Sequence, residues 1–239
     1  GNLAWGDIEA IVGAIRRLGQ RQEKRDILSL GVGEMLEVYY GSHIFAPQAR
    51  RLALPPYDPR ALPEVALAAA VAPIGGDLRY SMMYEALLPE APPWLPDDPA
   101  HPQAVRGKVP RLIWHERFAA AVDSAGLCRR LALLAYQVAP TELNELISAT
   151  LGRAVNGVEV AMLGERVVTL ERALALRYGA EQDTLPHRWT ETPLEDGPAA
   201  GRLPSLDDML GAYYRRHGWD KQGVPPQTRL TELGISFPE

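Results

Sequence analysis

The chain has 239 residues, of which 46% are hydrophobic and 23% charged, and it carries a formal net charge of -5. These values are typical of a globular protein, and they exclude a disordered or membrane-embedded chain. The acidic balance also argues against a nucleic-acid partner, which would need a basic surface to displace counterions from phosphates. On length alone, one large domain or two small ones are equally reasonable.

The cysteine content and the apolar stretches indicate a cytoplasmic protein. Cys128 is the single cysteine, so no internal disulfide can form, and no signal segment opens the chain. The longest apolar stretch, residues 65–74, is shorter than the roughly 20 residues that span a bilayer, so no membrane anchor is expected. The sequence begins at Gly1-Asn2 without an initiator Met, which suggests a truncated or processed polypeptide.

Apolar residues recur at spacings of three and four along much of the chain, which is typical of helices that bury one face. In chain order this pattern predicts helices at residues 8–18, 32–40, 63–71, 112–122, 142–151, 160–178, 206–217 and 228–233. Asp7, Thr141 and Ser205 (with Asp208 in a capping box) are the predicted N-caps. Glycines are predicted to end four of these helices, at Gly19, Gly152, Gly179 and Gly218.

Proline and glycine mark the connections between these helices. Pro55 to Pro59 restricts the backbone to extended or turn conformations and suggests a subdomain boundary. Gly75-Gly76 permits positive φ or close backbone approach, and the proline-rich segment 88–103 is expected to be an irregular surface connection. Residues 183–204 are predicted to form another loop. Because no alternating run of β-branched residues appears, the predicted fold class is all-α.

The common catalytic and nucleotide-binding motifs are absent. There is no Gly-rich phosphate loop, no H-E-x-x-H and no paired Cys-x-x-Cys. The histidines show no metal-ligand spacing and are expected at the surface or at caps: His43, His101, His115, His187 and His217. Ser124 lacks an accompanying base or oxyanion motif, so a role as a nucleophile is not expected. No catalytic residue is assigned.

Asp123 and Cys128 each have two interpretations. Cys128 lies beside Leu127 and is most simply a small buried hydrophobic residue. Asp123 is either the N-cap of a helix starting at Ser124 or a carboxylate that accepts hydrogen bonds from a ligand, with Gly126 allowing the backbone to come close. The residue pattern by itself favours the cap and leads no further than a helical globular domain.

The segment Asp123-Ser124-Ala125-Gly126-Leu127-Cys128 resembles the second D-x-x-G-L-C motif of the aldehyde:ferredoxin oxidoreductase family. Other stretches resemble the family in the same order along the chain: Gly1-Asn2, Leu54-Pro55-Pro56-Tyr57-Asp58-Pro59-Arg60, Gly164-Glu165-Arg166, Leu170-Glu171-Arg172, Asp183-Thr184-Leu185-Pro186-His187-Arg188, Met209-Leu210-Gly211-Ala212-Tyr213-Tyr214, Gly218-Trp219-Asp220, Gly223-Val224-Pro225 and Leu230-Thr231-Glu232-Leu233-Gly234. The resemblance covers essentially the whole chain. It implies that residues 1–60 end the second, helical domain of the family and that residues 61–239 form its third domain, an irregular helical one.

The resemblance also implies a set of cofactor contacts. Asp123, Gly126 and Leu127 would contact a pterin of a tungsten or molybdenum bis-pterin cofactor, and Cys128 would bind a 4Fe-4S cluster. The remaining ligands would come from an N-terminal domain or subunit that this sequence lacks, so the chain alone is expected to be incomplete and inactive. The implied reaction is oxidation of an aldehyde to a carboxylic acid, with ferredoxin or another electron-transfer protein accepting the electrons.

The sequence departs from the family pattern at two places. No His follows Asp77 in Gly75-Gly76-Asp77-Leu78-Arg79, where the family has G-A-D-H-L-R with a His near the substrate. Residues Leu174 to Gly179 replace the family's F-N-x-R-E-G and lose polar groups. Two alternatives therefore stay open: a catalytic subunit of benzoyl-CoA-reductase type, and a cofactor-free helical scaffold or interaction module.

Overall fold

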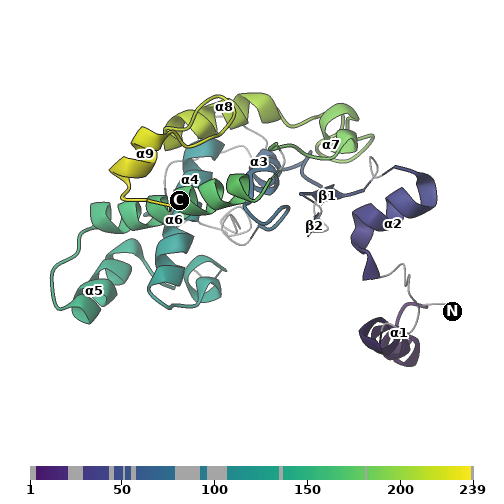
Figure 1. Ribbon diagram of the computed structural model, residues 1–239, viewed down its shortest axis with the longest axis horizontal. Coiled ribbons are helices and arrows are strands. Elements are labelled where there is room, and N and C mark those ends of the chain that lie inside the picture. Colours follow the sequence, from purple (N-terminus) through teal and green to yellow (C-terminus); the bar gives the residue numbers. More distant parts are fainter. Residues whose placement is uncertain are drawn as a thin grey trace.

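The computed structural model describes residues 4–20, 29–42, 46–50, 52–54, 58–78, 92–95, 107–134, 137–180 and 182–237, and over these ranges the predicted all-α fold is confirmed. The elements are α1 (Ile8–Gln20), α2 (Gly31–Tyr40), β1 (Gln48–Ala49), β2 (Leu52–Ala53), α3 (Pro63–Val71), α4 (Lys108–Ser124), the π-helix η3 (Arg130–Leu134), α5 (Pro140–Leu151), α6 (Gly157–Arg177), α7 (His187–Glu191), α8 (Leu206–His217) and α9 (Gln227–Glu232). Helices α3 to α9 form the main body, and α1 and α2 lie to one side of it (Figure 1).

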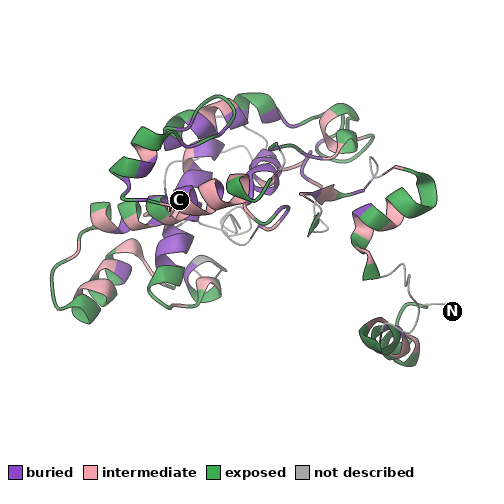
Figure 2. Ribbon diagram, viewed as in Figure 1, coloured by how far each residue is buried: buried purple, intermediate pink, exposed green. Residues whose placement is uncertain are grey.

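Local signals account for the first two helices. The Asp7 carboxylate accepts a hydrogen bond from the backbone N–H of Ala10 at 2.9 Å, as expected of an N-cap. Helix α1 continues through Gly19 to Gln20, so the prediction that Gly19 ends it is wrong. Helix α2 ends at Tyr40 and is capped by Gly41, which has a φ of 67°. The apolar face of α1 is open, with Ile8 73% and Ile15 61% exposed (Figure 2).

Two short strands that the sequence pattern did not predict form an antiparallel hairpin, β1–β2. Gly75 and Gly76 pack against this hairpin with φ of 59° and 51°, so both predicted uses of the glycine pair, positive φ and close approach, are confirmed. A Cβ at Gly76 would lie 2.7 Å from a methyl carbon of Leu54. Helix α3 precedes the pair, begins with Pro63 in its first turn as predicted, and is buried almost throughout.

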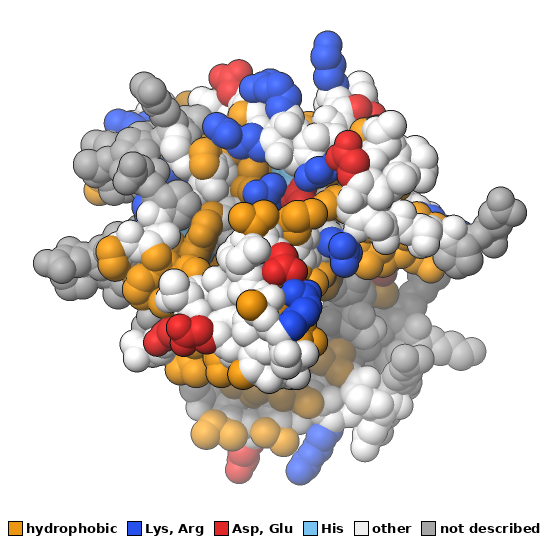
Figure 3. Space-filling view, turned by 90° about the vertical axis from the view of Figure 1, so that its left-hand side faces the viewer, with side chains coloured by type: hydrophobic (Ala, Val, Ile, Leu, Met, Phe, Trp, Pro, Cys, Tyr) orange, Lys and Arg blue, Asp and Glu red, His pale blue; other side chains and the backbone are white. Residues whose placement is uncertain are grey.

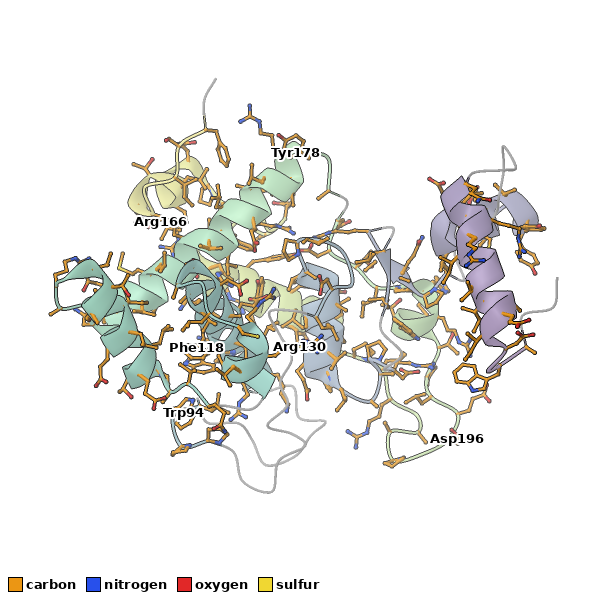
Figure 4. The ribbon with its side chains drawn as sticks, turned by 90° about the horizontal axis from the view of Figure 1, so that it is seen from below. Trp94, Phe118, Arg130, Arg166, Tyr178 and Asp196 are labelled. Atoms are coloured by element: carbon orange, nitrogen blue, oxygen red, sulfur yellow. The ribbon has the colours of Figure 1, made fainter. Side chains whose placement is uncertain are left out.

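The core lies where α4 crosses α6 (Figure 4). One cluster joins α3, α4, α6 and α8 through residues such as Leu67, Leu112 and Met209. A second cluster joins the end of α4 to α5 and α6 through Val122, Leu143 and Val160. Burial of these apolar faces, at about 25 cal/mol per Å² removed from water, is the main force that holds the helices together.

The close approach of α4 and α6 depends on Gly164. A Cβ added there would lie 2.6 Å from the carbonyl carbon of Arg117, which is a backbone atom and cannot rotate away. We therefore expect Gly164→Ala to lower the free energy of unfolding by about 1–3 kcal/mol through overpacking. Urea denaturation measures the change. The matched control is Gly211→Ala in α8, where the new methyl group would meet only a flexible arginine tip at 3.5 Å; this variant should be neutral or slightly more stable.

Several predicted helix ends need correction. Helix α5 begins at Pro140 with Ala139 as its N-cap, so Thr141 lies inside the first turn instead of capping it. The Glu142 carboxylate accepts the Ala139 N–H at 2.6 Å.

Ser205 precedes α8 but makes no side-chain capping bond, so the predicted capping box is wrong although the helix range is correct. Helix α6 starts earlier than predicted because Asn156 caps it, accepting the N–H groups of Val158 and Glu159.

The loops were predicted less well than the helices. Residues 183–204 contain the short helix α7, and residues Pro55 to Tyr57 and most of 88–103 lie outside the described residues. Of the predicted glycine stops, Gly152, Gly179 and Gly218 all have positive φ.

Across the described ranges no helix has the length and apolarity needed to cross a membrane. The face at the α5 and α9 end carries basic and acidic side chains next to one another, with apolar groups between them (Figure 3).

Candidate functional site

The chain reverses sharply after α4, and this turn holds the residues of the D-x-x-G-L-C segment. Gly126 adopts a φ of 73°, its N–H donates to the carbonyl of Asp123 at 2.9 Å, and the Leu127 N–H donates to the carbonyl of Val122 at 3.1 Å. This pair of bonds is the Schellman motif, in which a left-handed glycine closes a helix. Leu127 packs onto the apolar cluster below, so the backbone of the turn is fixed.

The Asp123 side chain lies in the last turn of α4, where a carboxylate faces the negative end of the helix dipole. Its Oδ1 accepts from Nε of Arg129 at 2.8 Å, and the two side chains are 34% and 23% exposed. The arginine offsets the unfavourable position of the carboxylate. It also joins the first residue of the turn to the residue that follows Cys128.

Cys128 is exposed and lies two residues before η3. Hydrogen bonds from the backbone N–H groups of Leu131 and then Arg130 lower the pKa of the Cys128 thiol, with a smaller contribution from the charges of Arg130 and Arg129. Figure 4 labels Arg130, the first residue of η3. A thiol held closer to its thiolate form and open to the surface has the properties of a metal ligand, because the thiolate is the form that binds metal.

The structure therefore places the predicted site residues on one turn, with Asp123, Gly126 and Cys128 all at the surface. Two interpretations drawn from the pattern alone are wrong. Cys128 is not a buried hydrophobic residue, and Asp123 does not cap a helix at Ser124, since Ser124 ends α4 and its hydroxyl donates back to the carbonyl of Ala120 at 2.7 Å. Arg129 was missed, although a basic residue directly after the Cys was a visible signal.

A buried ionic cluster lies in the main body, centred on Asp183. Its carboxylate is fully buried and pairs with the guanidinium groups of Arg50 and Arg172, whose side chains are 9% and 4% exposed. The Tyr214 hydroxyl also donates to Asp183, at 2.6 Å, and burial followed by this hydrogen bond raises the pKa of Tyr214. We call Arg50, Arg172, Asp183 and Tyr214 the Asp183 cluster.

A second polar cluster joins α4, α6, α8 and α9. Glu165 accepts from Nδ1 of His217 at 3.0 Å, from Arg117 at 2.7 Å and from Arg229 at 2.8 Å. Burial acts to raise the pKa of the Glu165 carboxyl, but these donors outweigh it and leave the pKa lowered. Burial lowers the pKa of His217, so the neutral ring donates from Nδ1.

Glu116 lies near the other ring nitrogen of His217, Nε2. We call Glu116, Arg117, Glu165, His217 and Arg229 the Glu165 cluster. The Tyr213 hydroxyl donates to the Glu116 carboxyl at 2.8 Å, and Nε2 of His217 lies 3.9 Å from the same oxygen. Burial is the main reason that the pKa of Glu116 rises to about 8, with the nearby charge of Glu165 adding to it. Glu116 is therefore largely neutral at pH 7.

The histidines follow the prediction only in part. His115 and His217 are fully buried, so the expectation of surface or capping positions is wrong for these two, whereas His187 is exposed and pairs with Glu191. Within the ranges that the structure describes, no group of three or more His, Cys, Asp or Glu residues is arranged to hold a metal ion. A cavity of about 520 Å³ lies between α2 and residues 182–187 and does not include the Asp123 turn.

Comparison with known proteins agrees with the motif order. Residues 1–235 match the family described as "Aldehyde ferredoxin oxidoreductase, domains 2 & 3". The chain is 30% identical over 236 residues to the tungsten-containing aldehyde ferredoxin oxidoreductases of Pyrococcus furiosus and Thermococcus kodakarensis, a match that covers 97% of this chain and 38% of each relative.

A shorter match links the chain to a protein of different printed name. It is 32% identical over 100 residues to the "Aliphatic sulfonate oxidoreductase, WOR-like subunit" of Pyrococcus furiosus, covering 35% of this chain and 16% of that protein. The match to domains 2 and 3 over nearly the whole length is the decisive finding. This chain belongs to the aldehyde ferredoxin oxidoreductase family and corresponds to the C-terminal part of its tungsten-containing members.

Proposed function

We propose that this chain is the C-terminal portion of a tungsten- or molybdenum-pterin oxidoreductase that oxidises an aldehyde to a carboxylic acid. Electrons would leave through a 4Fe-4S cluster to ferredoxin or a similar acceptor. The observation that supports this function is the joint placement of Asp123 and the exposed thiol of Cys128 on the fixed turn after α4. The names of the relatives support the tungsten and aldehyde assignments.

The donor groups of the turn fit these cofactors. A carboxylate such as that of Asp123 accepts hydrogen bonds from the N–H groups of a pterin, and the left-handed Gly126 leaves open space above its backbone, since a Cβ there would meet nothing within 4 Å. A thiolate is the usual protein ligand of cluster iron, and Cys128 would supply one of the four. The metallopterin supplies the two-electron chemistry when bound; Asp123 and the Leu127 backbone would orient it.

The cofactors require a partner. Cluster iron needs about four thiolates, so a second polypeptide segment must supply the remaining cysteines. The exposed apolar side chains of Ile8 and Ile15 on α1, together with Trp5 just before the helix, form the kind of surface that a protein partner covers. We propose that this partner is an upstream domain or subunit. The single cysteine, which must stay reduced to bind iron, fits a cytoplasmic location.

Metal analysis after anaerobic purification tests the proposal. Produced together with the upstream domain or subunit, the chain should carry tungsten or molybdenum and about four iron atoms, whereas the isolated chain should carry little of either. Cys128→Ser is expected to lower the iron content of the assembled protein, and Ser205→Ala, at an exposed serine before α8 whose side chain makes no capping bond, is the control. A cofactor-free scaffold would carry neither metal when assembled, and stoichiometric metal in the isolated chain would contradict the need for a partner.

A further inference from the structure

The ion pair between Asp123 and Arg129 spans the turn that carries both proposed cofactor ligands. The Nε–Oδ1 distance is 2.8 Å, and the pair connects the residue where the turn begins to the residue after Cys128. The Schellman bonds fix the backbone at Gly126, but they leave the rotamer of the Asp123 side chain undetermined. Arg129 supplies the missing constraint on that side chain.

The geometry also leaves Asp123 able to receive a ligand. A carboxylate offers about four acceptor positions on two oxygens, and one charge-assisted bond from Nε occupies one of them. The Asp123 side chain remains 34% exposed while it is paired, so a ligand can approach it from solvent. An arginine in this position holds the carboxylate without filling its binding capacity.

The position of Asp123 in the helix makes this support necessary. A carboxylate in the last turn of α4 lies at the negative end of the helix dipole, which repels it, and no basic residue lies within that turn. Without Arg129, the side chain would gain by turning away from the helix end toward water. It would then lose its link to the residue that follows Cys128.

We infer that Arg129 is a positioning residue that holds the Asp123 carboxylate in the orientation that receives the pterin, and so fixes the pterin relative to the cluster bound at Cys128. This inference rests on the proposed function. It assigns to Arg129 no contact with the pterin and no role in the redox chemistry.

The test uses the assembled protein with its upstream domain or subunit and measures the molar ratio of pterin to iron. Pterin is quantified by fluorescence after oxidative release, and iron by mass spectrometry. Arg129→Gln should lower the ratio roughly tenfold, by analogy with the lower end of what loss of an outer-shell partner costs in metal affinity or activity. Arg129→Lys keeps the charge but lacks the Nε–H donor, and should lie between Arg129→Gln and the wild type. Arg153→Gln, which breaks an exposed arginine–carboxylate pair of 2.9 Å at the start of α6, should not change the ratio.

Asp123→Asn separates failure of this inference from failure of the proposed function. If Asp123→Asn keeps the wild-type ratio, the assignment of Asp123 as a pterin ligand is wrong. If Asp123→Asn loses pterin and Arg129→Gln does not, only the positioning role is overturned. Because Arg129 acts through Asp123, the double variant should lose no more pterin than Asp123→Asn alone. If Arg129→Gln does not fold, a wild-type ratio in Arg129→Lys overturns the inference.

Discussion

Replacing Asp183 with Asn is expected to lower the free energy of unfolding by about 3–5 kcal/mol, among the largest effects of any single substitution in this chain. Asp183 is fully buried and neutralises two guanidinium groups, those of Arg50 and Arg172, which are themselves almost inaccessible to water. The amide side chain has nearly the same shape but no charge. The two arginines would remain buried beside each other without their counter-ion, which is far more costly than the loss of a hydrogen bond.

Thermal or urea denaturation measures this effect, and the melting temperature should fall by on the order of 10 °C. The matched control is Glu191→Gln, which removes the partner of His187 in a pair whose side chains are 53% and 62% exposed; it should cost less than about 1 kcal/mol. Equal, small losses in the two variants would contradict the view that the Asp183 cluster holds the segment after α6 against the β-hairpin.

Replacing Glu116 with Gln is expected to remove the contribution of Glu116 to the pH dependence of stability, which is a loss of stability as the pH rises from about 5 to 8. The pKa of Glu116 in the folded protein is raised from 4.5 to about 8, mainly by burial. The folded state therefore binds a proton that the unfolded state releases over this range. Its stabilising contribution is complete below pH 4.5 and is lost as the pH rises through 8, with a slope of up to about 1.4 kcal/mol per pH unit.

Denaturation midpoints measured across this pH range test the prediction. Glu116→Gln keeps an acceptor for the Tyr213 hydroxyl but cannot ionise, so the variant should gain on the wild type as the pH rises. Glu232→Gln, whose carboxylate is 65% exposed on α9, is the control and should follow the wild-type profile. The opposite trend is expected of Glu165: its pKa is lowered, so its stabilisation is present above pH 4.5 and lost as the pH falls below it. Parallel profiles for Glu116→Gln and the wild type would show that Glu116 is charged in the folded protein.

The sequence alone determined most of the helices, because their signals are local. Apolar spacing located α8 at its observed residues, Pro63 and Asp7 marked two helix starts, and Gly152 and Gly218 marked two ends. The order of motifs identified the family, and the D-x-x-G-L-C segment located the candidate site. A helix and its terminal glycine depend on neighbours within one or two turns, and such neighbours are visible in the sequence.

The tertiary structure decided which polar residues meet. Asp183 pairs with Arg50, 133 residues away in the sequence, and Glu165 pairs with Arg229, 64 residues away, and no local pattern encodes such contacts. The same holds for whether Cys128 is buried or exposed, because that depends on how η3 packs beside α4. Thr141 and Ser205 show that a favourable residue type is not sufficient for a cap. The observed N-cap of α5 is Ala139 instead of Thr141, and Ser205 precedes α8 without a side-chain capping bond. Local preference determines where helices form. Only packing determines which of their charged side chains are buried and therefore need a partner of opposite charge.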